Sequence, residues 1–107
     1  MELVLDGDVL ERHSSRQGNY TLAEGLVEGF PYWNQQDGEH AIWKSPFVSR
    51  WLLGWKGMLG TTWAYMFVRM FSKVWPTQIL GGYHYAKSQS WHHASSNDVQ
   101  LKDCKYK

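Results

Sequence analysis

Turn-forming residues recur about every 8–12 residues along much of this chain, and this spacing constrains its fold more than any other feature. Glu28-Gly29, Asp37-Gly38 and Ser45-Pro46 each follow a short apolar or aromatic segment. Most helices need a longer uninterrupted segment, whereas strands of about four to eight residues fit between such turns. The spacing therefore predicts a mainly β protein, built as a single small antiparallel sheet or barrel-like domain.

Aromatic residues supply much of the apolar material for a core. The 107 residues include seven tryptophans, six tyrosines and four phenylalanines. One ring buries roughly 150–250 Å², so a few rings can replace many aliphatic side chains in a small domain. We expect an aromatic core in a Trp-rich β domain over residues 20–107. Residues 1–19 are expected to form a polar N-terminal arm and linker, with a weak hairpin at Asp6-Gly7.

Side-chain alternation predicts the members of the core. Period-2 spacing places Trp51, Leu53 and Trp55 on one face of residues 51–55. The same spacing puts four aromatic side chains on one face of residues 63–71, namely Trp63, Tyr65, Phe67 and Phe71. Residues 63–71 are apolar on both faces, which is typical of a central strand. A helix over residues 61–74 is the alternative, because the same side chains also fit helical spacing. The residues expected to be buried together are Trp51, Trp55, Trp63 and Phe67.

The remaining segments carry weaker signals. Residues 20–33 predict two strands joined tightly at Glu28-Gly29, and Asp37-Gly38 predicts the next hairpin. Residues 74–86 contain a proline and a Gly-Gly pair and are expected to be mostly loop, followed by a last pair of short strands around residues 95–98. A membrane-spanning helix over residues 51–68 is disfavoured by its glycines and by Lys56 in mid-span.

No residue pattern predicts catalysis, a metal site or a cofactor. His92 and His93 are adjacent, so on a strand their side chains point to opposite faces and would not share one zinc ion with His84. Cys104, the single cysteine, is expected to be a free thiol or to pair only with another chain. The net charge of +1 gives no field that would attract nucleic acid. We therefore predict a non-enzymatic protein that does not bind nucleic acid.

Four aromatic-rich segments follow one another from Tyr20 to Cys104, in the order "GNYTLAEGLVEGFPYW", "AIWKS", "RWLLGWKGMLGTTWAYM" and "SWHHASSNDVQLKDC". This order of motifs resembles a small Trp-rich β module that recurs, often in tandem, in proteins of marine protists such as dinoflagellates. The resemblance implies a binding or structural module without catalytic residues. It also implies an accessory subunit of a larger assembly, such as a photosynthetic or respiratory membrane complex inside an organelle, with the chain at the periphery of that complex.

One apolar segment departs from this module and suggests a partner surface. Residues 66–80 are more apolar than a free-standing domain requires, and Arg69 and Lys73 lie among them as rim charges. The partner would be another protein chain or a membrane-embedded subunit. The residues predicted to bind it are Met70, Phe71, Val74, Trp75 and Ile79.

A lectin-like carbohydrate-binding module is the alternative function. Tryptophans that lie beside polar residues rather than inside apolar strands are the ones available to stack on a sugar ring. The predicted sugar-binding residues are Trp33, Asn34, Gln35, Asp37 and Trp91.

Overall fold

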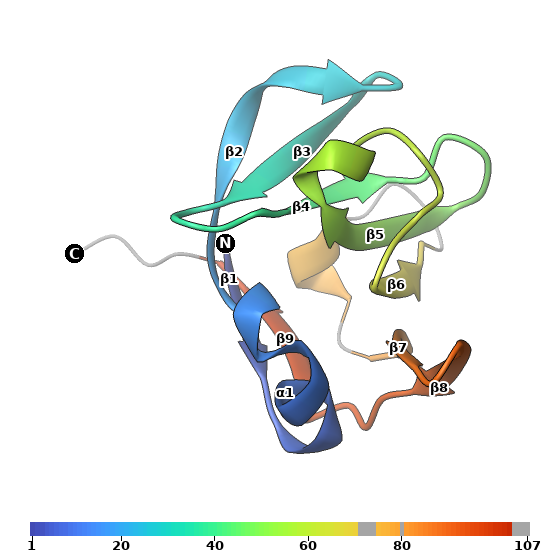
Figure 1. Ribbon diagram of the computed structural model, residues 1–107. Helices are drawn as coiled ribbons and strands as arrows, with labels where there is room; N and C mark the ends of the chain where they lie inside the picture. Colours follow the sequence, from blue (N-terminus) through green and yellow to red (C-terminus); the bar gives the residue numbers. More distant parts are fainter. Residues whose placement is uncertain (71–74, 80, 104–107) are drawn as a thin grey trace.

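The structure is a computed structural model that describes residues 1–70, 75–79 and 81–103 (Figure 1). Within these residues the chain forms nine strands and one short α-helix, so the predicted mainly β class is confirmed. The elements are β1 (Glu2–Leu5), α1 (Gly7–His13), the 3-10 helix η1 (Ser14–Arg16), β2 (Gly18–Val27), β3 (Phe30–Gln35), β4 (His40–Lys44), β5 (Arg50–Trp55), η2 (Lys56–Met58), β6 (Met66–Arg69), η3 (Pro76–Gln78), β7 (Tyr83–Lys87), β8 (Ser90–His93) and β9 (Val99–Lys102). No helix among these residues is long and apolar enough to cross a membrane.

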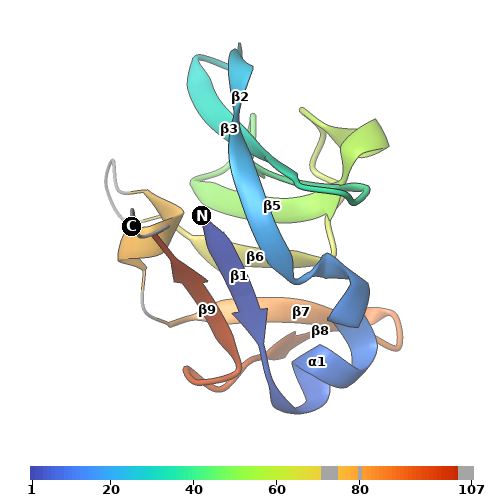
Figure 2. The ribbon, with the colours of Figure 1, turned by 90° about the vertical axis from the view of Figure 1, so that its left-hand side faces the viewer.

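The strands form one curled antiparallel sheet in the order β8-β7-β6-β5-β4-β3-β2-β1-β9. Seven consecutive strands, β1 to β7, each pair with the next strand in the chain. Only β9 joins the sheet away from its neighbour in sequence, β8. It lies beside β1, with Leu3 opposite Leu101 (Figure 2). The expected last pair of strands, β8 and β9, therefore exists, but its two members pair with different partners.

Two predicted hairpins are confirmed. In the turn between β2 and β3, Glu28 and Gly29 both have positive φ, at 49° and 79°, as a two-residue type I′ turn requires. Asp37 has φ of 57° in the turn between β3 and β4. The expectation of mostly loop over residues 74–86 is wrong for Tyr83–Lys87, which form β7. This strand turns into β8 through Ser88 and Gln89, both with positive φ.

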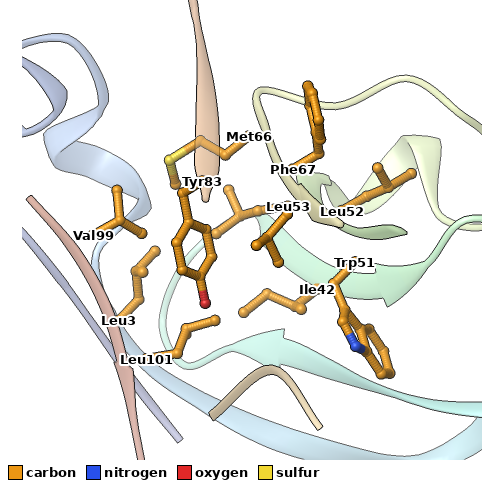
Figure 3. A pocket seen from close by; sticks show the side chains of 11 residues that line it. Leu3, Ile42, Trp51, Leu52, Leu53, Met66, Phe67, Tyr83, Val99 and Leu101 are labelled. Carbon is orange, nitrogen blue, oxygen red and sulfur yellow. The ribbon is translucent and has the colours of Figure 1, made fainter. Parts of the chain in front are cut away.

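The concave face of the sheet holds the main core. The ring of Tyr83 lies among aliphatic side chains from distant strands, including Leu3, Leu53 and Leu101 (Figure 3). The cavity left between these side chains is only about 20 Å³. An apolar cavity that accepts benzene measures about 150 Å³, so this interior is packed side chain rather than a ligand chamber.

The predicted core is only partly right. Trp51 is buried at 2% exposure, but Trp55 is 47% exposed and Trp63 is 60% exposed. Trp55 is the last residue of β5, where it pairs with His40, and Trp63 precedes β6. Both rings therefore lie at the margin of the sheet rather than over the middle of the core. Phe67 is half-buried in a second cluster, with Trp43 and Leu52, on the outer face.

The strand interpretation of residues 61–74 is confirmed for Met66–Arg69, although β6 is not the central strand. Its inward face is the one with Met66, Val68 and Met70, because these side chains are buried in the main core. Alternation identified two faces correctly but did not show which of them points inward.

The first 19 residues contribute to the core rather than only to an arm. Leu3, Leu5 and Val9 are buried in the same cluster as Tyr83. The hairpin expected at Asp6-Gly7 is wrong, because α1 begins at Gly7. The Asp6 carboxylate accepts a 2.8 Å hydrogen bond from the Gly7 amide and caps the helix.

Candidate binding site

Of the residues predicted to bind a partner, the structure describes Met70, Trp75 and Ile79, and the first and last of these are not exposed. Met70 is buried in the main core, and its amide donates a 2.8 Å hydrogen bond to the Ser49 carbonyl group. Ile79 is half-buried and packs against the same core. Phe71 and Val74, like Cys104, lie outside the described residues. Trp75 is the member of the set that the structure places on the surface, with 49% of its area exposed.

Trp75 belongs to a three-tryptophan cluster. The ring centroids of Trp33 and Trp51 are 5.8 Å apart, those of Trp33 and Trp75 6.2 Å, and those of Trp51 and Trp75 6.4 Å. Aromatic pairs at such separations contribute about 0.5–1.5 kcal/mol beyond the area they bury. Trp51 is the buried base of the cluster, and Trp33 and Trp75 are progressively more exposed.

The short helix η3 positions Trp75. The Trp75 amide donates a 2.7 Å hydrogen bond to the Gln78 side chain, which closes the first turn. Pro76 is buried, and the Tyr83 hydroxyl group donates to the Pro76 and Ile79 carbonyl groups at 3.3 and 3.4 Å. The indole is therefore presented by backbone that the core holds in place.

A surface hollow of about 320 Å³ lies between Trp33 and Trp75. Its other walls are mainly apolar and come from the first residue, from β2 and from β3. Leu22 is 63% exposed at its edge, and Thr77 and Asp103 provide the polar part of its lining. We call this feature the Trp33–Trp75 hollow. Its lining residues are Met1, Leu22, Pro31, Trp33, Trp75, Thr77 and Asp103.

The predicted sugar-binding residues do not form one site. Asn34 follows Trp33 on β3, so the two side chains point to opposite faces of the sheet. Asp37 is exposed in the turn after β3. Trp91 lies on β8, the edge strand of the sheet that is separated from β3 by four other strands, and it lines a different hollow.

Gln35 is not available to a ligand, which corrects the prediction for this residue. Its amide nitrogen donates to the Ser15 and Gln17 carbonyl groups at 2.8 and 3.0 Å. Its side-chain oxygen accepts from the His40 amide at 3.2 Å and lies 2.8 Å from His40 Nδ1. Gln35 is buried, and the hydrogen bonds of its side chain connect β3 to the segment before β2 and to His40.

A second hollow, of about 270 Å³, lies between Trp63 and Trp91. Trp91 is held by an edge-on contact with Phe67, at 4.8 Å between ring centroids. Thr62, Gln89 and Ser90 supply uncharged polar lining. We call this feature the Trp63–Trp91 hollow. Trp63 has the spacing of a core residue, so the sequence does not identify it as a surface residue.

A polar cluster that the sequence did not reveal lies between η1, β4 and the segment before β6. The Arg16 guanidinium group lies 3.7 Å above the Tyr65 ring, and Tyr65 also contacts the rings of His13 and His40. His13 Nε2 donates to the Ala86 carbonyl group at 2.8 Å. Burial lowers the pKa of His13, and burial together with the Arg16 charge lowers the pKa of His40 to about 4. Both shifts favour the neutral imidazole at pH 7.

Among the described residues, no group of three or more His, Cys, Asp or Glu side chains could hold a metal ion. The geometry defines a small β protein with two aromatic hollows on its surface. A scan against protein-family models and searches of curated proteins and of solved structures found no match. The resemblance to the protist module therefore stays a prediction.

Proposed function

We propose that this protein is a non-enzymatic interaction module that binds another protein chain through the Trp33–Trp75 hollow. The observation that carries the proposal is the exposed half of Trp75, which lies over a hollow whose opposite wall is a second indole ring. Trp is the residue most enriched among those that dominate the free energy of protein–protein binding. An apolar side chain of the partner would fill the hollow.

The surroundings of the hollow support a protein partner. Leu22 and Leu26 are both more than 60% exposed on β2, so the apolar surface extends along the strand beyond the hollow. Thr77 and Asp103 supply polar groups, as the rim of a protein interface does. The role of accessory subunit in an organellar membrane complex stays a prediction of the sequence resemblance.

Site-specific crosslinking in the native cell extract tests this function. A photo-reactive phenylalanine analogue replaces Leu22 at the edge of the hollow, or Phe47 as a control. Phe47 is 81% exposed and is not part of the hollow lining. We expect one protein species to crosslink at position 22 and not at position 47.

The same experiment with Trp75→Ala should lose the crosslinked species, because its ring forms one wall of the hollow. Trp55→Ala is the matched control, since Trp55 has similar exposure and does not line the hollow. A species that persists in Trp75→Ala, or that also forms at position 47, would contradict the proposal.

Carbohydrate binding is the second candidate function, and the Trp63–Trp91 hollow favours it. A sugar ring has an apolar face that an indole can bury, and its hydroxyl groups then need hydrogen-bond partners. Thr62 and Gln89 make no side-chain hydrogen bond within the described part of the chain, so both are free to serve. On a glycan array, binding that is lost in Trp91→Ala and retained in Trp75→Ala would support this function. An array with no bound glycan would contradict it.

A further inference from the structure

Two arginines face each other across neighbouring strands on the outer face of the sheet. Arg50 on β5 and Arg69 on β6 are direct partners in the strand register. Directly opposed residues of an antiparallel pair have Cβ atoms only about 4.5–5.5 Å apart, and like charges in that arrangement are destabilising. A pair that opposes folding in this way needs a reason to be present.

No acidic side chain neutralises this pair within the described residues. The ion pairs found there both involve Asp8, which contacts Arg12 at 3.2 Å and Lys87 at 3.1 Å. Neither the Arg50 nor the Arg69 guanidinium group makes a hydrogen bond or an ion pair in that part of the chain. Their hydrogen-bond donors are therefore free for a ligand.

The guanidinium group of Arg50 is held in place by an aromatic stack. It lies 4.2 Å above the Phe67 ring, and Phe67 is stacked on His84 with the two rings parallel and 4.7 Å apart. Such support reduces the side-chain entropy that Arg50 would lose on binding. A planar guanidinium fork with fixed orientation is well suited to two oxygens of one anion.

The two arginines line a surface hollow of about 330 Å³. Gly81 and Gly82, which directly precede β7, form part of its wall and have no side chains that would fill it. At Gly82 the space where a Cβ atom would lie is empty to a distance of 4 Å. The lining residues are Arg50, Phe67, Val68, Arg69, Gly81, Gly82 and His84, and this set contains no carboxylate.

We propose that Arg50 and Arg69 bind a tetrahedral oxyanion, phosphate or sulfate. The two guanidinium groups together carry a charge of +2. A divalent anion balances this charge, whereas a single carboxylate, with a charge of −1, does not. A tetrahedral anion also offers enough oxygens for both forks at once, whereas a carboxylate has two. This site is separate from both aromatic hollows and does not depend on the proposed protein partner.

Titration of the full chain with inorganic phosphate tests the site. The ionic strength is held constant with sodium chloride, and amide NMR shifts of Arg50, Arg69, Gly81 and Gly82 report binding. We expect saturable shifts at these residues with phosphate and with sulfate, and much weaker ones with acetate. Shifts that do not saturate, or that acetate reproduces at the same concentration, would overturn the proposal.

Variants separate a binding role from a structural one. Arg69→Gln should weaken phosphate binding at least tenfold, and at low salt it should leave the thermal midpoint unchanged or higher, because it removes the repulsion. Lys102→Gln is the charge-matched control at an exposed position outside the hollow. Equal weakening in both variants would show only a general charge effect and would overturn the site.

The source of the anion is distinguished by comparing inorganic phosphate with phosphoserine. Tighter binding of phosphoserine, lost in Arg69→Gln, would identify a phosphorylated protein side chain as the ligand. Equal affinities would identify the free anion. Failure of both to bind would overturn the proposal and leave the two aromatic hollows unaffected.

Discussion

The Tyr85 hydroxyl group donates a 2.6 Å hydrogen bond to Asp8 Oδ2, across 77 positions of sequence. The same carboxylate contacts Lys87 at 3.1 Å and Arg12 at 3.2 Å. One acidic side chain thereby connects α1 to β7.

Asp8 should make the protein sensitive to acid. The hydrogen bonds from Tyr85 and Lys87 lower the pKa of Asp8 from 3.8 to about 2. A carboxylate with a lowered pKa stabilises the fold above pH 3.8, and this contribution is lost as the pH falls through 3.8 toward 2. We expect the free energy of unfolding to fall less steeply over this range in Asp8→Asn than in the wild type. Urea unfolding at several pH values measures it, and parallel curves would contradict the assignment.

His40 should affect stability at higher pH than Asp8 does, and its pKa is shifted by burial rather than by hydrogen bonds. Burial and the Arg16 charge lower its pKa from 6.5 to about 4, so between these values the unfolded chain binds more protons than the folded protein. Stability is therefore expected to rise with pH across this window. Imidazole NMR titration of the folded protein measures the pKa directly. A His40 midpoint near 6.5 would show that the ring is solvated and that the polar cluster is open.

Trp51 and Trp63 should differ sharply when truncated. Trp51→Ala removes a ring that is 2% exposed, and we expect it to lower the free energy of unfolding by about 3–5 kcal/mol. Trp63→Ala removes a ring that is 60% exposed and should cost less than about 1 kcal/mol. Urea unfolding of both variants provides the comparison. Similar losses would mean that Trp63 is a core residue after all.

Gly54 should not tolerate even one added methyl group. A Cβ atom there would lie 2.7 Å from a carbon of the Trp43 ring and 3.0 Å from the Trp63 carbonyl oxygen. Trp43 is fully buried and its indole nitrogen donates a 3.0 Å hydrogen bond to the Thr61 carbonyl group, so the ring has little freedom to move. Gly54→Ala should cost about 1–3 kcal/mol through overpacking.

Gly25→Ala is the control for that substitution. Gly25 also lies in a strand, and its nearest atoms to an added Cβ are 3.8 Å away on Tyr32, an ordinary contact distance. Thermal unfolding should show little change for Gly25→Ala. A loss as large as that of Gly54→Ala would indicate a general cost of alanine in this sheet rather than a clash with Trp43.

The sequence by itself determined the features that depend on a few neighbouring residues. Glu28-Gly29 and Asp37-Gly38 specify their turns because Gly, Asp and a few other residues accept positive φ at low cost. Alternation over residues 51–55 and 66–70 identified the two faces of those strands. From these local signals the mainly β class and two of the hairpins could be predicted, whereas the similar Asp6-Gly7 pair begins a helix instead.

Only the tertiary structure decided which surface faces inward and which distant residues meet. Local spacing is the same whether Trp63 points to the core or to water, and the outcome depends on whether a neighbouring strand covers it. The pairing of β1 with β9 joins the two ends of the chain, and no local pattern encodes that contact. The meeting of Trp33 with Trp75, and the opposition of Arg50 and Arg69, likewise follow from strand order and register. The candidate sites lie at these contacts between distant residues, which is why sequence analysis found some of their members but not their arrangement.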